Sequence, residues 1–573
     1  MKIRIPLMIQ DPMTTKRRGI KPIEGFDPDR EAFFLDGPVT ERIAILDFSP
    51  TTGGLLKGAT FRPPPPRRVR GWYENAAGAD LYRAKGNDLY TPAFMQVSVF
   101  GTVLKTMYLF EKKDTLGRPL SWAFNAPQLL VVPRAGKWAN AFYHRDSHSL
   151  QFYYFPSPKD RGRKVFTCLS RDIVAHETGH AIVDGIAPDL LDACTPQSLA
   201  IHETIADLTA LLMAFDSHTL RNFVLKKTRG SIENSTAFSS IAEEFGAELK
   251  HTTGLRNLLN KKNLNPQDVE NSVRRDEPHA LSEVLSGALY SVMIKIHKGL
   301  KEEYAKEPEY AKRADPLFSA SGAALQKGAE RFKRMIFRAL DYLPPGEVSF
   351  ADYGRAIIAV DLVAYPDDDR MRDWISAEFV SRFIVPDESA LEVRTRFVHK
   401  VFKKIDAPTL YASDWASYEF ANRNRPLLCM PSNIPFHVRR RLRVVKKYDH
   451  DETGHECIFK VSWDHIEPNP IGSGYPAERR ITVGTTLAID WETSMILARL
   501  TSAPPADSGE YRQQRQDRDM FLQRLVKEGL LKVGKHAIGP DGQPLLSAIQ
   551  AEVKGGIMRT RSTAKLLHIV GKR

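Results

Sequence analysis

The spacing of apolar residues predicts several helices in the first two thirds of the chain. A helical pattern of apolar positions covers residues 91–112, and others cover 280–300, 320–343 and 349–363. Apolar residues that recur at a helical period are typical of amphipathic helices packed on a core. This part of the chain is therefore predicted to be mainly helical.

Two further helices have clear starting signals. Ser170 suits an N-cap position, and the helix that it begins is predicted to end at Gly185. Thr195 is the predicted cap of the next helix, with Pro196 in its first turn and an apolar stretch that continues to Phe215.

Strand patterns appear in two places. Residues 129–132 and 149–155 are rich in β-forming residues. Residues 440–500 alternate between apolar and polar types and predict a β-rich C-terminal part, followed by a charged helix over 511–531. The expected fold class is therefore α+β.

The first 70 residues are predicted to be an irregular arm because they are rich in Gly and Pro. Four consecutive prolines at 63–66 favour an extended polyproline II segment. We expect this segment to be a stiff spacer, and docking on an aromatic groove is the alternative.

Composition narrows the class of protein. The chain has 573 residues, of which 42% are hydrophobic and 26% charged, as in globular proteins of several domains. No uninterrupted apolar run approaches the roughly eighteen residues of a membrane span, and no signal peptide is evident. Four cysteines without a CxxC pair argue against a disulfide scaffold. We therefore expect a cytoplasmic protein with no membrane span, although export by another route remains an alternative.

The net charge is +13, and the C-terminal third carries most of it. Residues 387–573 hold 30 basic and 22 acidic residues, which contribute +8. Such an excess favours an acidic partner or nucleic acid, yet no nucleic-acid motif and no long Lys/Arg block is present. A mildly basic solvated surface is the simpler interpretation, and nucleic acid is not an expected partner.

The first of the two capped helices contains the candidate chemistry. His176, Glu177 and His180 form an HExxH motif. Histidines at positions i and i+4 share one helix face and can bind the same metal ion, while the glutamate can approach a metal-bound water.

The second capped helix contains two acids within an apolar stretch. Glu203 and Asp207 lie four residues apart and 23 and 27 residues after His180. Glu203 is the candidate third ligand, which leaves one zinc position open, as catalytic sites require. Asp207 is the candidate hydrogen-bond partner of a ligand histidine. Two amphipathic helices with solvated acids would not explain why these two acids interrupt an apolar helix.

The sequence resembles the thermolysin family of zinc metalloproteases, which pairs HExxH with a downstream ExxxD helix. HETGHAIVDGI and IHETIADLTALL have this form, and NAFY at 140–143, GLRN at 254–257 and DEPH at 276–279 resemble further family segments in the same order. The resemblance covers about residues 85–386. It implies a two-lobed fold with a mixed α/β N-lobe, a helical C-lobe and a zinc cleft between them.

The resemblance also implies roles for individual residues. Asn140 and Ala141 would hold the substrate as an added strand, and Arg256 would bind a substrate carbonyl group. His279 would stabilise the oxyanion, with Asp276 (or the neighbouring Glu277) orienting its imidazole ring.

The sequence departs from the family pattern in two respects. The stretch 191–193 lacks the tyrosine that assists the oxyanion in the family, and Ala214 occupies the position of a family calcium ligand. We therefore expect no structural calcium and a greater dependence on His279.

These observations predict a zinc-dependent endopeptidase with one zinc ion per chain and a peptide or protein substrate. The alternative is a catalytically silent zinc fold that acts as a protein-interaction module. The predicted organisation is an N-terminal arm over 1–84, an N-lobe over 85–185, a helical C-lobe over 186–386 and an appended basic domain over 387–573. This last domain is the candidate site for a protein partner.

Overall fold

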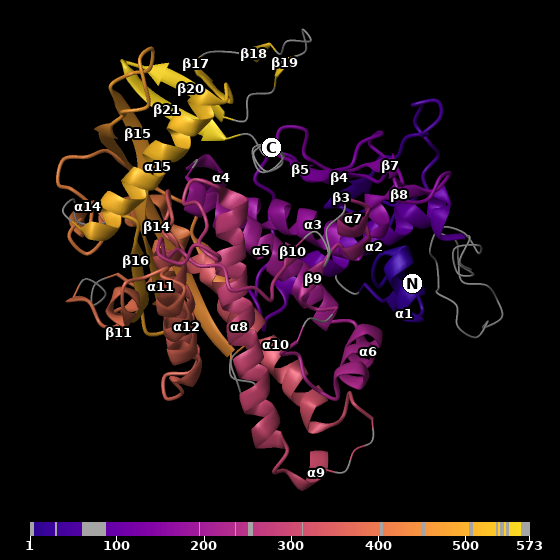
Figure 1. Cartoon of the computed structure of the whole chain (residues 1–573). Coiled ribbons are helices and arrows are strands. Elements are labelled where there is room, and N and C mark those ends of the chain that lie inside the picture. The colour runs from indigo at the N-terminus through magenta and orange to yellow at the C-terminus, as the bar shows by residue number, and fades with distance from the viewer. Residues whose placement is uncertain are drawn as a thin grey trace.

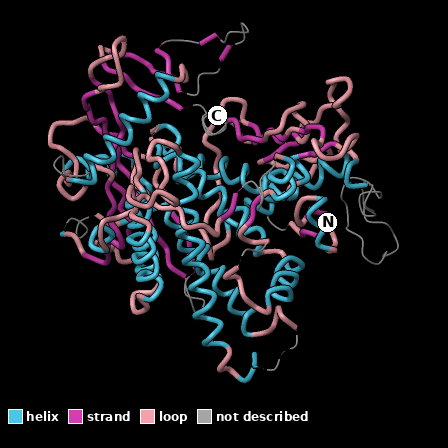
Figure 2. The backbone as a smooth tube through the Cα atoms, viewed as in Figure 1, coloured by secondary structure: helices cyan, strands magenta, loops and turns pink. Residues whose placement is uncertain are grey.

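The protein combines helices and sheets in one chain, as the computed structural model in Figures 1 and 2 shows. The structure describes residues 5–59 without 29, 30 and 32; 88–533 without 194, 235–236, 250–255, 312, 314, 401–404, 448–452 and 504–507; and 537–538, 544–545 and 549–562. The α+β class is therefore confirmed. The predicted proline segment at 63–66 lies outside the described residues.

A four-stranded sheet lies in the N-terminal part of the chain. Its strand order is β3 (Ile43–Ile45), β4 (Leu129–Val132), β6 (Ser149–Phe152) and β5 (Ala141–His144). The first three strands are parallel, and β5 is antiparallel to β6 at the edge of the sheet. The predicted strand at 149–155 is divided, because β6 ends at Phe152 and β7 (Tyr154–Pro156) pairs with β8 (Lys164–Phe166) instead.

The beginning of the chain is not irregular. Strand β1 (Ile5–Met8) pairs with β2 (Ile23–Phe26) around helix α1 (Pro12–Arg18), and β1 packs on helix α2 (Pro92–Glu111). Gly101 of α2 makes this contact possible, because a Cβ atom there would lie 2.5 Å from Ile5 Cγ2. The prediction of an arm was wrong here because long-range packing on α2 organises these residues.

A group of helices surrounds α3 (Arg171–Ile186) and α5 (Pro196–Phe215). The Ser170 hydroxyl caps α3 as predicted, whereas Thr195 occupies the N-cap position of α5 without a side-chain hydrogen bond. Helix α3 contacts α2, α5 and the edge strand β5, and α5 contacts α8. The predicted helical segments are confirmed as α8 (Pro278–Tyr304), α10 (Ala320–Tyr342) and α11 (Phe350–Ala364). The remaining helices of this part are α4 (Asp189–Asp192), α6 (His218–Thr228), α7 (Glu243–Glu248), α9 (Pro308–Ala311) and α12 (Arg370–Ser381).

Helices α2 and α5 are long enough and apolar enough on average to cross a membrane, although neither is an uninterrupted apolar run. In the most apolar stretch of each helix, 89% of α2 and 100% of α5 is buried inside the protein. Their place in the core accounts for their composition.

The C-terminal part is built on a large sheet, as predicted. In the described residues this sheet has nine strands, and the long antiparallel pair β14 (Thr453–Pro468) and β15 (Glu478–Asp490) lies at its centre. Helix α15 (Gly509–Lys527) corresponds to the predicted charged helix. The other helices and strands are β11 (Thr395–Phe397), α13 (Ala407–Ala412), α14 (Asp414–Arg423), β12 (Phe436–Val438), β13 (Leu442–Lys447), β16 (Ile496–Thr501), β17 (Leu531–Val533), β18 (Ala537–Ile538), β19 (Pro544–Leu545), β20 (Ile549–Lys554) and β21 (Ile557–Ser562).

One hydrophobic cluster crosses the boundary predicted at residue 386. Val444, Ile458, Leu497 and Leu500 from the large sheet belong to the same buried cluster as the helices α2, α3, α8, α10 and α11. Helix α15 forms a second cluster with Leu199 of α5. The C-terminal part therefore packs on the helical part and does not stand apart from it, as Figure 1 also shows.

Candidate metal centre

Helix α3 places the two histidines of the HExxH motif together. Its N-cap is Ser170, whose hydroxyl accepts a hydrogen bond from the Ile173 N–H. The Nε2 atoms of His176 and His180 are 3.1 Å apart. Two nitrogens bound to one zinc ion at 2.0–2.1 Å in tetrahedral geometry would be about 3.3 Å apart, so this spacing fits a shared metal ion.

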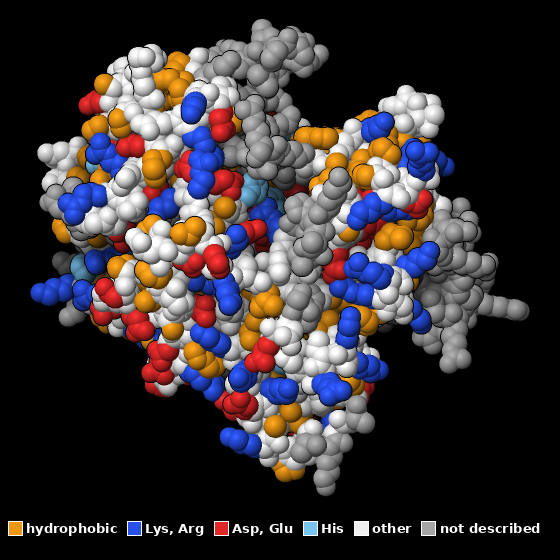
Figure 3. All heavy atoms as spheres, in the orientation of Figure 1, with side chains coloured by type: hydrophobic (Ala, Val, Ile, Leu, Met, Phe, Trp, Pro, Cys, Tyr) orange, Lys and Arg blue, Asp and Glu red, His pale blue; other side chains and the backbone are white. Residues whose placement is uncertain are grey.

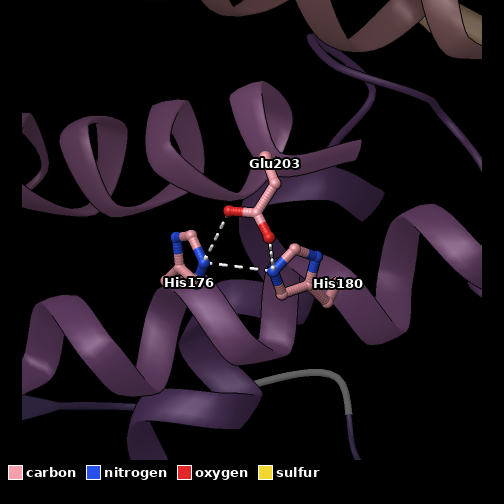
Figure 4. A group of neighbouring side chains, drawn as sticks. All are labelled: His176, His180 and Glu203. Carbon is pink, nitrogen blue, oxygen red and sulfur yellow. Dashed lines mark hydrogen bonds and ion pairs between the residues drawn. The ribbon is translucent and has the colours of Figure 1, made fainter. Parts of the chain in front are cut away.

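Helix α5 brings Glu203 to the same point. Its carboxylate oxygens lie 3.7 Å from His176 Nε2 and 3.5 Å from His180 Nε2, and Figure 4 shows the three side chains pointing at one another from two helices. The helices approach closely at Gly179, where a Cβ atom would lie 3.1 Å from the Ala206 Cα. In the described part of the chain, these three residues are the one group of His, Cys, Asp and Glu found close enough to hold a metal ion, with ligand atoms within 4.8 Å.

Asp207 lies next to His176, one of the candidate ligands, at the place expected for it from the sequence. Its Oδ1 is 3.0 Å from His176 Nδ1, which leaves Nε2 directed at the site. Burial alone would lower the pKa of His176, but the hydrogen bond and charge of Asp207, together with the charges of Glu177 and Glu203, outweigh burial and raise this pKa.

His202 contacts the other histidine, His180, a contact that the sequence pattern did not predict. Its Nδ1 is 2.7 Å from His180 Nδ1, and the two rings stack 4.8 Å apart. Burial, reinforced by the positive charge of Arg145, lowers the pKa of His202 to about 3, so this imidazole is neutral near pH 7. The only signal in the sequence was its position directly before Glu203.

The edge strand β5 fixes the motif glutamate. The backbone N–H of Tyr143 donates a hydrogen bond to Glu177 Oε2 at 3.1 Å. Glu177 is buried, and burial raises its pKa to about 7. Ala141 begins the same strand, and the preceding Asn140 is buried with its Nδ2 lacking a hydrogen-bond partner among the described residues.

His279 lies at the start of α8, close to Glu203. Its Nε2 is 3.7 Å from Glu203 Oε1, and its Nδ1 is 3.4 Å from Glu277 Oε1. Asp276 pairs instead with Arg274 at 2.7 Å. Of the two acids considered for orienting His279, the structure therefore places Glu277, and not Asp276, against the imidazole ring.

Arg256 directly contacts Glu203, the candidate third metal ligand. Its Nη2 donates to Glu203 Oε2 at 2.6 Å, its Nη1 donates to Ser282 Oγ at 3.0 Å, and its Nε is 3.5 Å from Asp207 Oδ1. These contacts occupy the guanidinium group that was expected to bind a substrate carbonyl. Leu255, which precedes it, lies outside the described residues.

The stretch 191–193, which lacks the family tyrosine, is connected to α3 through ion pairs of Arg145. Asp192 pairs with Arg145 at 2.7 Å, and Arg145 also binds Asp184 of α3. The Tyr143 hydroxyl donates to the same Asp184 at 2.8 Å and is buried. These bonds join β5, α3 and α4.

The space-filling view in Figure 3 shows a histidine side chain in a hollow between the part of the molecule around α15 and the part around β5. On the remainder of this face, basic and acidic side chains are interspersed.

Comparison with known proteins adds no assignment. No family model matches the chain. No curated protein matches it significantly.

Proposed function

We propose that this protein is a zinc-dependent endopeptidase with a thermolysin-like arrangement of residues 85–386. The observation that carries the proposal is the convergence of His176, His180 and Glu203 beside the buried carboxylate of Glu177. Two imidazoles and one carboxylate are the protein ligands of several catalytic zinc sites, which keep a fourth position for water or substrate.

His176, His180 and Glu203 would hold the metal ion. When bound, zinc lowers the pKa of a coordinated water to about 7 and polarises a carbonyl group. Asp207 and His202 would keep the two imidazoles oriented through their Nδ1 atoms.

Glu177 would move the proton. Glu177 directly follows the proposed ligand His176, so the Glu177 carboxylate lies beside the site. The Tyr143 N–H fixes the orientation of this carboxylate. In peptide hydrolysis, this carboxylate would accept a proton from the attacking water and deliver it to the departing amine. His279 would donate a hydrogen bond to the oxyanion, with Glu277 orienting the ring.

The edge position of β5 supports a peptide substrate. An edge strand offers unpaired backbone groups, and an extended peptide can bind there as an added strand. Asn140 and Ala141 lie at the start of this edge. We assign Arg256 to Glu203 and Asp207 rather than to the substrate, because its guanidinium group is already bound there.

The test uses three variants of the full-length protein with zinc and a peptide library. Glu177→Gln should retain zinc but lose at least about 10³-fold in kcat, because it lacks the proton acceptor. Glu203→Gln should lose zinc, measured by metal analysis after dialysis. Glu302→Gln, an exposed glutamate on α8, is the matched control and should behave as wild type.

Two results would contradict the proposal. If wild type with one zinc per chain cleaves no peptide, the alternative of a silent zinc-binding module is favoured. If Glu177→Gln retains activity within tenfold of wild type, Glu177 is not the proton acceptor.

A further inference from the structure

A cavity lies at the junction of the helical part and the large sheet. Its volume is about 240 Å³. It is bordered by the C-terminal ends of α3 and α10, the loop before α11, and strands β13 and β14. Its apolar wall includes Ile186, Pro188, Leu343, Pro344, Val348 and Leu442.

Four cationic side chains line this cavity. They are Arg118, Arg439, Arg440 and Lys460, which come from three separate segments of the chain. Among the described lining residues, Asp189 is the one acid. It accepts hydrogen bonds from the Gly346 N–H at 3.0 Å and from Arg439 at 3.3 Å.

Lys460 has no carboxylate within ion-pairing distance in the described part of the chain. Its Nζ donates to the carbonyl oxygen of Leu343 at 2.9 Å. Burial lowers its pKa to about 8, which leaves the amine largely protonated at pH 7. The attraction of Asp341 is offset by Arg118, which pairs with that carboxylate at 2.6 Å. Lys460 is half-buried, and an ammonium group withdrawn from water in this way is costly unless an anion compensates it.

Arg440 is exposed and likewise lacks a carboxylate partner among the described residues. The C-terminal ends of α3 and α10 offset part of this positive charge, because each helix end carries about half a negative charge. Together with Asp189 and Asp341, they offset about three of the four cations, so roughly one positive charge remains uncompensated.

We propose that this cavity binds a small organic anion, with a carboxylate or phosphate head held by the cations and an apolar body packed against Leu343, Pro344 and Leu442. None of the residues that line this cavity is His176, His180 or Glu203, and the proposal does not depend on the proposed peptidase activity. The charges select an anion, and the apolar wall selects a ligand with a hydrocarbon or aromatic body.

The experiment is isothermal titration of the full-length protein with hexanoate, phenyl phosphate and the neutral analogue hexanamide. Comparing the two anions distinguishes a carboxylate from a phosphate head. Arg440→Gln and Lys460→Met remove cavity cations. Arg443→Gln is the matched control, because Arg443 lies on the same segment, is exposed and packs on the Trp491 ring.

We expect at least one anion to bind, with Kd raised about tenfold or more by Arg440→Gln and by Lys460→Met and changed less than about twofold by Arg443→Gln. The same anion should slow chemical labelling of the Lys460 amine in wild-type protein, a measurement that needs no variant. Hexanamide should not bind. The proposal is overturned if neither anion binds at about 10 mM, if hexanamide binds equally well, or if Arg440→Gln leaves Kd unchanged.

Discussion

Removing residues 387–573 should prevent the remainder from folding. Val444, Ile458, Leu497 and Leu500 are at most 6% exposed and share a cluster with the helical part. Burying each such side chain contributes about 1.5–3 kcal/mol, so their loss removes about 6–12 kcal/mol. The helices that they cover would also expose apolar area. A domain is typically stable by only about 5–15 kcal/mol, so this loss alone is comparable to the total.

Polar contacts across the boundary add to this cost. The fully buried Arg518 of α15 binds Glu347 and Glu467, and Glu347 would lose this partner. The Tyr342 hydroxyl would also lose its hydrogen bond to Glu456 at 3.0 Å.

The assay compares a chain ending at residue 386 with the full chain by thermal unfolding, limited proteolysis and zinc retention. A chain ending at residue 562 is the control, because it lacks only residues outside the described part. We expect the 386-residue chain to be insoluble or to unfold without cooperativity, and the control to match the full chain. A cooperative transition within about 3 °C of the full chain would refute the argument that the two parts share one core.

Three further predictions follow from single contacts. Arg256→Met should destabilise zinc-depleted protein by about 3–5 kcal/mol, because Glu203 loses its cation, and zinc-loaded protein by much less; equal losses in melts with and without chelator would contradict this. Gly346→Ala should cost at least about 2 kcal/mol more than Gly474→Ala in denaturant unfolding, because both have positive φ but only Gly346 faces a carbonyl oxygen, 2.0 Å from its added Cβ; equal costs would exclude the clash. The folded-state pKa of Lys460 is about 8 against an ordinary 10.5, so its charge destabilises the fold below pH 8 and this cost disappears as pH rises to 10.5. Wild type should therefore gain about 3 kcal/mol relative to Lys460→Met over this range in buffer without organic anions, and a constant difference would show that the amine is not buried in charged form.

The sequence by itself determined the parts of the candidate site that lie on single helices. Four-residue spacing places His176 and His180 on one face of α3, and it places Glu203 and Asp207 on one face of α5. The capping residue Ser170 determined where α3 begins. These features are local, and helix geometry converts spacing directly into position.

Only the tertiary structure decided which side chains from different elements meet. Arg256 binds Glu203 across 53 residues, and His202 contacts His180 across 22. Such pairs depend on how α3, α5 and the β10 segment (Arg256–Asn257) pack, which local periodicity does not encode.

The same reason explains the two ends of the chain. Strand β1 is organised by its packing on α2, and the large C-terminal sheet is stabilised by burial against the helices. Alternation of apolar and polar residues predicted the strands of this sheet, but not the surface that they cover. That surface follows from the burial of apolar area between segments far apart in the sequence, which only the folded chain brings together.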